Sequence, residues 1–424
     1  MKFARTNWKT VTVNALALAT LGVWLGAARA ARRSGRSLSW LDDARKAGDD
    51  ECPALSVIVP ACNEAAVIEP AMRSLLAIDY PHLEIIAVND RSTDDTGIIL
   101  ERLANDHTSP VTALNVCTVK TLPPGWLGKN HALATGAAAS RGEFLLFTDA
   151  DVVFRPDALR RAAAAALDRK ADHLVVAPGV ILTGFWERLL VCYFAVMFSL
   201  RCRTWEIDDP DKPDSYIGIG AFNMVRRSAY DAIGGHERLR LEVADDLKLG
   251  KLLKQAGFRQ LYVLGGDPVK VRWVEGLSGF VNGLTKNFFA GLEYEWTTVI
   301  GVTLFIGVAH ILPAPGLFWG TRFSRLCCAG AMAAMVVAVT PPRRPESPVG
   351  TRWPDELSTQ QRALQGAWER TARTPWALFA LCFPLAAGVW LYTMWRSAVL
   401  TEKRGGVEWR GTFYRLEDLK KGVV

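Results

Sequence analysis

The chain has 424 residues, of which 50% are hydrophobic, and a formal net charge of +7 at pH 7. Its mean hydropathy of +0.11 is high for a soluble enzyme of this size, so membrane segments are expected beside a catalytic domain. The positive charge suits nucleic acid or a membrane surface, but Arg29, Arg32, Arg33 and Arg36 directly follow an apolar run. This placement favours membrane topology and disfavours nucleic-acid binding.

The cysteine pattern argues against a disulfide-stabilised domain and against a zinc-binding domain. None of the eight forms a C-x-x-C pair, and Cys327 and Cys328 are adjacent inside an apolar run. A disulfide framework is therefore not expected, and no spacing suits a zinc site. Reduced, mostly buried thiols are typical of a cytoplasmic catalytic domain.

The first element expected is a membrane anchor. Residues Val11–Ala28 form an uncharged apolar run that is just long enough to span a membrane. A cleaved signal peptide is the alternative, because a basic region precedes the run and Ala28–Ala30 resembles a cleavage site. The arginines that follow would resist translocation, which favours the anchor. We therefore expect an anchor over residues 1–30, a charged linker over 31–53 and a cytoplasmic domain after it.

Strands and helices alternate in the next part of the chain. Short strands are expected at Leu55–Pro60, Glu84–Val88, Val111–Val119, Phe144–Phe147 and Leu174–Ala177. Helical patterns lie between them, and this alternation predicts βαβ units with a mostly parallel sheet. We expect an α/β catalytic domain over residues 54–292.

The strand Phe144–Phe147 is the most informative of these. Its four apolar residues suit a strand buried on both faces, and it ends in Thr148-Asp149-Ala150-Asp151. Open α/β sheets bind ligands beyond the carboxyl ends of their strands. A turn that brings Asp149 and Asp151 together would hold Mg2+ or Mn2+ with phosphate oxygens, as in a site for a nucleotide diphosphate. A solvated turn at the end of a strand is the alternative.

Two further polar residues bear on this hypothesis. Asp90 ends the strand at Glu84–Val88, where it would accept hydrogen bonds from a ribose or base, or cap the next helix. Lys129 lies in a Gly-rich loop ahead of the acidic pair, where it would offer a point charge to a diphosphate or remain an ordinary surface lysine.

Two pairs of residues later in the chain each allow a functional and a structural interpretation. Asp245 and Asp246 begin a helix, where acids are favourable in themselves, or where one would act as a general base on an acceptor hydroxyl. Arg272 and Trp273 follow the last strand, where they would hold the leaving phosphates and stack on a sugar or base. Anchoring beside a membrane is the alternative for that pair.

The carboxyl-terminal part contains more apolar segments. Candidate spans are Thr297–Leu317, Leu326–Thr340 and Pro375–Met394, which give about three helices in a region over 293–400, with a tail over 401–424. The loop 341–374 and the tail are both basic. An odd number of helices would place them on opposite sides of the membrane, so the side of the tail stays open.

Taken in order, these motifs resemble the family 2 inverting glycosyltransferases of the GT-A fold. Bacterial members with several membrane helices that glycosylate lipids look most similar, among them hopanoid-associated, carotenoid-type and ceramide glucosyltransferase-like enzymes. The ending Trp409–Tyr414 is similar to their tails. The stretches that carry the resemblance are Ser56–Glu64, Val88–Thr96, Gly125–Ala132, Phe147–Phe154, Gly220–Glu237 and Ala244–Gly257.

The resemblance implies a role for each matching residue. The chain departs from the family pattern at Asn89, where Asp is usual, and at Asp245, where Glu is usual. The second departure leaves open which of the two helix-start acids is the base, with Asp246 matching the family's base. The implied roles are Pro60, Glu64 and Asp90 around the nucleoside, Lys129 at the phosphates, Asp149 at the donor, Asp151 as main metal ligand and Asp246 as base.

The resemblance implies transfer of one sugar from a nucleotide-sugar, expected to be a UDP-sugar, to a lipid hydroxyl, with Mg2+ or Mn2+. The expected location is a bacterial inner membrane, with several spans and a cytoplasmic catalytic domain. A polyprenyl-phosphate glycosyltransferase and a processive synthase remain alternatives, although Val269 stands where the synthases' Q-x-x-R-W motif has Gln. An inactive nucleotide-sugar-binding subunit is the non-enzyme alternative, which the intact acids disfavour. The sugar, the lipid and the oligomeric state are left open.

Overall fold

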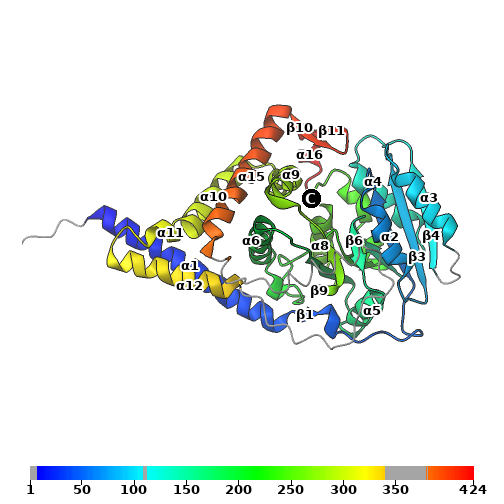
Figure 1. Ribbon diagram of the computed structural model, residues 1–424, viewed down its shortest axis with the longest axis horizontal. Coiled ribbons are helices and arrows are strands. Elements are labelled where there is room, and N and C mark those ends of the chain that lie inside the picture. The colour runs from blue at the N-terminus through cyan, green and yellow to red at the C-terminus, as the bar shows by residue number, and fades with distance from the viewer. Residues whose placement is uncertain (1–6, 108–111, 340–378, 380) are drawn as a thin grey trace, which may run out of the picture.

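The computed structural model describes residues 7–107, 112–339, 379 and 381–424. Figure 1 shows an α/β domain on one side and a group of long helices on the other. Among these helices, α1 (Trp8–Ser37) and α12 (Arg322–Val339) lie side by side and extend away from the domain.

A single mixed sheet forms the centre of the domain, with strand order β1-β9-β7-β8-β5-β2-β3-β4 and β6 paired to β9. The pairs of β2 with β3 and β5, of β3 with β4, and of β9 with β1 and β7 are parallel. Strand β8 is antiparallel to β5 and β7. The predicted α/β class with a mostly parallel sheet is therefore confirmed. The strands are β1 Ser39–Trp40, β2 Leu55–Ala61, β3 Leu83–Asp90, β4 Thr112–Val119, β5 Phe144–Phe147, β6 Val152–Phe154, β7 His173–Val180, β8 Asn223–Arg226 and β9 Gln260–Val271.

Helices cover both faces of this sheet, and β5 shows why. Phe144 and Leu146 pack into the cluster formed with α2 (Ile68–Leu76), α3 (Thr96–Asp106) and α5 (Ala158–Asp168). Leu145 and Phe147 point the other way, toward α4 (Gly128–Ala139), α7 (Arg227–Ala232) and α8 (Asp245–Gln255). Alternate side chains of a strand face opposite sides, so one apolar run supplies two cores. The predicted burial of this strand on both faces is confirmed.

The first turns of two helices carry residues of interest. Lys129 was expected in a Gly-rich loop, but α4 starts at Gly128 and Lys129 lies in its first turn. Helix α8 starts at Asp245, as the paired acids predicted, and ends at Gln255. Gly257 follows it with φ +84°, the left-handed conformation that often ends a helix and that glycine adopts without strain.

Helix α1 is packed into the helical part of the molecule. The Trp24 side chain is fully buried, and its Nε1 donates to the Ala309 carbonyl oxygen at 2.6 Å. Thr20 Oγ1 donates to the Val308 carbonyl oxygen at 3.1 Å. Both acceptors lie in the π-helical turn η4 (Gly307–Ile311), where the wider turn disturbs the regular helical hydrogen bonds. Side chains of α1 thus satisfy the backbone of η4.

Two helices in the described residues are long and apolar enough to cross a membrane. They are Trp8–Arg33 and Trp296–Gly316, and the second joins α10 (Trp296–Ile306), η4 and α11 (Pro313–Gly316). The predicted segments 326–340 and 375–394 lie partly outside the described residues, and the loop 341–374 lies wholly outside them. Helix α15 (Phe383–Arg404) packs against α9 (Gly276–Gly291) and α6 (Phe185–Cys202).

Residues 31–53 differ from the linker that was expected. Helix α1 continues to Ser37, and β1 then adds a parallel edge strand to β9. Leu41 follows it with a fully buried side chain in the main domain core. The charged composition of this stretch predicted a linker and gave no sign of these long-range contacts. The contacts join α1 to the sheet with few residues between them.

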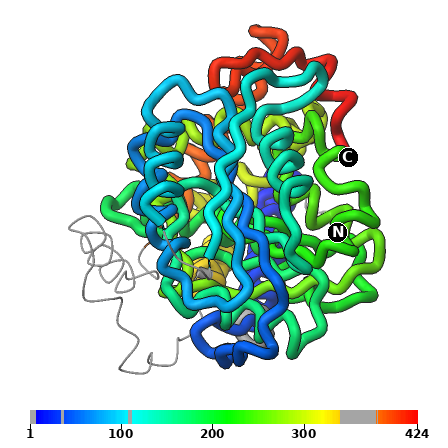
Figure 2. Tube along the Cα trace, turned by 90° about the vertical axis from the view of Figure 1, so that its right-hand side faces the viewer, coloured from blue at the N-terminus to red at the C-terminus, as the bar shows by residue number. Residues whose placement is uncertain are grey.

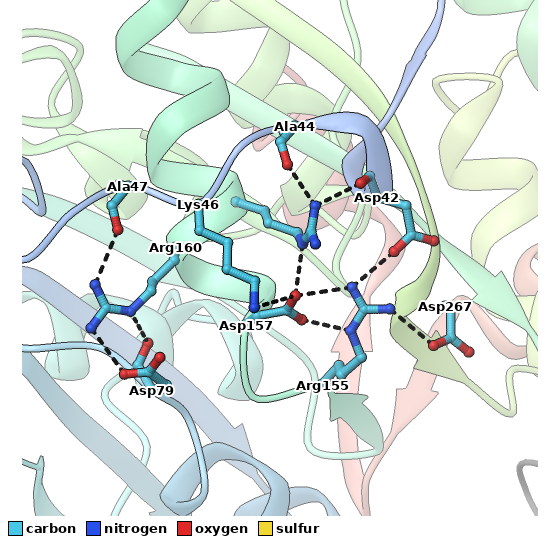
Figure 3. Close-up of polar contacts among 10 residues, drawn as sticks. Asp42, Ala44, Lys46, Ala47, Asp79, Arg155, Asp157, Arg160 and Asp267 are labelled. Atoms are coloured by element: carbon cyan, nitrogen blue, oxygen red, sulfur yellow. Dashed lines mark hydrogen bonds and ion pairs between the residues drawn. The ribbon is translucent and has the colours of Figure 1, made fainter. Parts of the chain in front are cut away.

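A buried ion-pair network fastens this segment to the domain. The Arg155 guanidinium, whose side chain is 3% exposed, lies between the carboxylates of Asp42 at 2.8 Å, Asp157 and Asp267 at 3.1 Å (Figure 3). Burial alone would raise the pKa of Asp157, but hydrogen bonds from Arg155 and Arg161 lower it to about 2. One cation therefore links the segment after β1, the start of α5 and strand β9.

Replacement of Arg155 by Met should destabilise the fold strongly, because it removes the cation shared by three largely buried carboxylates. We expect a loss of about 3 kcal/mol in the free energy of unfolding, measured by urea denaturation of the chain in detergent. The control is Arg169→Gln, which removes an exposed pair with Asp208 and should change little. Equal stability of the two variants would contradict this role for the network.

Candidate active site

The candidate site lies where β5 ends and the chain turns into β6. Thr148 is buried, and its Oγ1 donates to the Ala221 carbonyl oxygen at 2.8 Å. The Asp149 backbone N–H donates to the Gly220 carbonyl oxygen at 3.0 Å. A Cβ at Gly220 would come within 2.6 Å of Asp149 Oδ2, so this close approach requires glycine. The loop before β8 thus sets the direction of the Asp149 side chain.

Lys129 joins this turn to the start of α8. Its Nζ lies 3.0 Å from Asp149 Oδ1 and 3.6 Å from Asp245 Oδ1. Burial alone would lower the pKa of Lys129, but the carboxylates of Asp149, Asp245 and Asp246 raise it. Lys129 therefore stays charged inside a cluster of acids that come from separate loops.

Asp246 is held by two backbone amides. Its Oδ2 accepts from the Gly220 N–H and its Oδ1 from the Leu247 N–H, both at 2.7 Å. A Cβ on Gly218 would lie 1.7 Å from the Asp246 carbonyl oxygen, so the chain before β8 packs directly against the first turn of α8. Burial raises the pKa of Asp246. The carboxylate is fixed in orientation and poorly solvated.

Two other acids have strongly shifted titration. Burial raises the pKa of Asp245 to about 7, with Asp246 and Asp149 adding to the effect and Lys129 opposing it. Burial, followed by the charges of Asp149 and Glu64, raises the pKa of Asp151 to about 7. The charged form of Asp151 is therefore disfavoured both by burial and by the negative charges of Asp149 and Glu64.

A buried polar chain supports α8 from behind. Asn223 Nδ2 donates to the Asp246 carbonyl oxygen at 3.3 Å, and Asn223 Oδ1 lies 2.5 Å from His173 Nε2. Gln260 Nε2 lies 2.7 Å from His173 Nδ1, and Gln260 Oε1 accepts from the Ile217 N–H at 2.9 Å. Burial lowers the pKa of His173 to about 4, so the ring stays neutral. The chain connects β7, β8 and β9 with α8.

Four predicted residues line one cavity, namely Lys129, Asp149, Asp245 and Asp246. His236 also lines it, although the sequence offered no signal beyond the short motif around Gly234 and Gly235. The Tyr230 hydroxyl accepts from the His236 backbone N–H at 3.0 Å and lies 2.9 Å from its Nδ1. Burial lowers the pKa of His236 to about 3, so the cavity gains a neutral imidazole.

The loops after β2 and β3 form the neighbouring part of the site. Asn63 Oδ1 accepts from the Thr93 N–H at 2.8 Å, and the Glu64 N–H donates to Thr96 Oγ1 at 2.8 Å. Asn63 has φ +56°, an unusual conformation for a side-chain-bearing residue that asparagine adopts more readily than most. These bonds explain why the second loop is rich in hydroxyl and carboxylate side chains.

Asp90 differs from the simple hydrogen-bond acceptor expected at the end of β3. Its carboxylate is buried and accepts two hydrogen bonds from the adjacent Arg91 guanidinium, at 2.8 and 2.9 Å. Sequence reasoning missed Arg91, which also has φ +56°. A Cβ on Gly128 would come within 2.5 Å of both side chains, so glycine allows α4 to start against this pair.

The remaining predicted residues lie around these groups. Pro60 is in β2 opposite Val88, and Glu64 follows that strand. Arg272 and Trp273 do not line the cavity: Arg272 is half-exposed and pairs with Glu275 at 3.4 Å, whereas the Trp273 ring packs edge-on against Phe194 of α6 at 4.6 Å. Trp273 thus packs against α6, and its role stays a prediction.

Comparison with known sequences identifies the family of this domain. Residues 56–234 match the family described as Glycosyl transferase family 2. The chain is 38% identical over 234 residues to the probable glycosyltransferase YdaM of Bacillus subtilis, covering 53% of this chain and 51% of that protein. It is 23% identical over 250 residues to the 4,4'-diaponeurosporenoate glycosyltransferase of Staphylococcus haemolyticus, covering 58% and 64%.

A third relative is the GalNAc(5)-diNAcBac-PP-undecaprenol beta-1,3-glucosyltransferase of Campylobacter jejuni, 36% identical over 121 residues. This match covers 28% of this chain and 35% of that protein. The chain thus spans between about a third and two thirds of the length of these relatives.

Among solved structures, the mannosyltransferase PcManGT from Pyrobaculum calidifontis, in complex with GDP-Man and Mn2+, superposes with a TM-score of 0.50 at 19% identity. The match covers 92% of this chain and 99% of that one, and it concerns the fold. Sequence motifs, sheet topology and these matches agree, and the chain therefore contains a family 2 glycosyltransferase domain of the GT-A fold.

Proposed function

We propose that this protein transfers one sugar from a nucleoside diphosphate sugar to a hydroxyl group of a membrane lipid, with inversion at the anomeric carbon. The observation that carries the proposal is the meeting of Lys129, Asp149, Asp245 and Asp246 in one cavity of a family 2 glycosyltransferase domain. The family domain accounts for the donor class, and the acids and lysine supply groups for its phosphates and for proton removal.

The donor side would use Asp149 and Asp151 to hold Mg2+ or Mn2+, with Glu64 nearby. The raised pKa of Asp151 supports a cation there, because its neighbours are carboxylates. The described residues contain no group of three His, Cys, Asp or Glu side chains placed to hold a metal ion, so phosphate oxygens would complete the coordination. A bound cation would supply positive charge to the leaving diphosphate. The Mn2+ in the PcManGT complex is consistent with this use.

Asp246 would act as the base. Its amide bonds fix the carboxylate and leave further lone pairs on both oxygens, while burial strengthens it as a base. The acceptor hydroxyl would give its proton to Asp246 as its oxygen bonds to the anomeric carbon. The bond from that carbon to the phosphate oxygen breaks on the opposite face, and Lys129 balances charge at the phosphates.

A lipid acceptor is supported by the helical part. Trp8–Arg33 and Trp296–Gly316 are apolar enough to cross a membrane, and exposed apolar side chains lie along them. Two relatives act, by their names, on diaponeurosporenoate and on an undecaprenol-linked glycan. The narrower resemblance to hopanoid and ceramide enzymes stays a prediction, as do the inner-membrane location and the UDP-sugar.

The proposal is tested with the full chain in lipid vesicles, supplied with UDP-glucose, UDP-N-acetylglucosamine or GDP-mannose, Mn2+ and a bacterial lipid extract. Mass spectrometry should find a lipid heavier by one sugar on a hydroxyl. A sugar on a phosphate would indicate a polyprenyl-phosphate transferase, and a sugar chain a processive synthase. Nucleotide binding without transfer or hydrolysis would indicate an inactive subunit.

Asp246→Asn should lower the transfer rate by about 10²- to 10⁴-fold, because the amide cannot take the proton. Binding of the nucleotide should change little, as measured by calorimetry with UDP and Mn2+. Asp245→Asn is the matched control and should keep more of the transfer rate. The opposite order of the two rates would assign the base to Asp245.

Asp151→Asn should weaken the Mn2+ dependence of nucleotide binding. Loss of groups that only support a metal ligand costs roughly 10- to 100-fold, so loss of a direct ligand should cost at least about tenfold in UDP affinity with Mn2+ present. Affinity measured in EDTA should be the same for variant and parent. Asp106→Asn, at the exposed end of α3, is the control. An unchanged Mn2+ response in the Asp151 variant would remove it as the ligand.

A further inference from the structure

The carboxyl-terminal hairpin lies against the donor side of the site, far along the chain from the family domain. It consists of β10 (Gly406–Trp409) and β11 (Thr412–Arg415), which follow α15 and precede α16 (Leu416–Lys421). In Figure 1 the hairpin lies beside α15 and α16, and in Figure 2 the red end of the chain lies across the upper ends of the blue and cyan strands.

Three hairpin residues contact three separate donor-site segments. The Arg410 guanidinium pairs with the Glu64 carboxylate and donates to the Cys62 carbonyl oxygen, after β2. Thr412 Oγ1 accepts from Arg91 Nη1 at 3.1 Å, after β3. The Tyr414 hydroxyl accepts from the Gly128 N–H at 3.1 Å, at the start of α4. These are the segments that would surround a nucleotide.

The backbone conformation of the hairpin turn is unfavourable for an arginine at its first position. Trp409 pairs with Thr412, so Arg410 and Gly411 alone form the turn, with φ values of +50° and +73°. Such two-residue turns favour Asn, Asp or Gly at the first position, because other side chains crowd the backbone when φ is positive. An unfavourable arginine at this position suggests that its side chain acts outside the turn.

The charges around Arg410 suit a polyanion. Trp409 lies under Lys286 of α9, with Nζ 3.6 Å from the ring centroid. Burial and the charges of Lys129 and Arg410 lower the pKa of Lys286 to about 8, although the carboxylates of Asp149 and Asp245 oppose the shift. The contact with Trp409 puts Lys286 beside the turn that carries Arg410. Arg410 itself pairs with Glu64 and donates to the Cys62 carbonyl oxygen, both in the loop after β2.

We propose that the β10–β11 hairpin is part of the donor site and that the Arg410 guanidinium binds the diphosphate of the nucleotide-sugar. Glu64 holds the guanidinium in place, and its remaining N–H donors face the bound phosphate, with Lys286 adding a second cation. This inference rests on the proposed function, and it assigns a donor-binding residue that lies outside residues 56–234.

The test uses Arg410→Asn in the full chain, because Asn suits the positive φ and should leave the hairpin folded. Loss of a charge-assisted hydrogen bond should weaken UDP binding with Mn2+ by about 10- to 100-fold in calorimetry. The Michaelis constant for the donor should rise, with kcat nearly unchanged, and Arg410→Lys should restore part of the affinity. The matched control is Arg415→Asn on the same hairpin, where Arg415 is exposed and pairs with Glu417.

Each possible result of the Arg410→Asn experiment either supports or overturns the role of Arg410 in donor binding. Equal affinity of Arg410→Asn and the parent would exclude the hairpin from the donor site while leaving the proposed function intact. Tighter binding by the variant would mean that Arg410 competes with the donor, and would also overturn the inference. If the parent chain binds neither UDP nor GDP with Mn2+, the proposed function fails and the inference with it. A loss shared by Arg415→Asn would indicate a general disturbance of the hairpin and would overturn the specific role of Arg410.

Discussion

The candidate active site depends on one partly buried ammonium group. Lys129 Nζ lies between Asp149 and Asp245, and the strands and helices that carry these residues are far apart in sequence. Without this cation, repulsion between the carboxylates of Asp149 and Asp245 would oppose the approach of the turn after β5 to the start of α8. The charge that links these acids is also suited to a phosphate, so structural stability and donor binding would use one group.

Close backbone contacts make that arrangement rigid. Gly218 and Gly220 let the chain before β8 touch both Asp246 and Asp149, and Gly250 lets α8 lie against Ile217. The buried chain of Asn223, His173 and Gln260 is satisfied by hydrogen bonds on both sides. Proton transfer and charge stabilisation both benefit from groups that need not reorganise during the reaction.

The sequence predicted what depends on local pattern. The apolar run of β5, the acids that follow it and the helix start at Asp245 were visible, because burial on both faces and helix-end preferences act within a few residues. Three features could not be predicted from the sequence. They are the hydrogen bonds from Arg91 to Asp90, the position of His236 in the cavity and the packing of residues 38–47 on the sheet. They depend on partners that only the fold brings near, as does the packing of Trp273 against Phe194.

The short connection between α1 and the sheet edge has a geometric consequence. Helix α1 is joined to β1 by a very short connection, and the ion pairs of Arg155 fix the residues that follow β1. With α1 in a membrane, the catalytic cavity would therefore stand at one set height above the bilayer. An acceptor hydroxyl would have to reach that height on its own head group, so the length of the head group would act as a ruler that selects among lipids of similar chemistry.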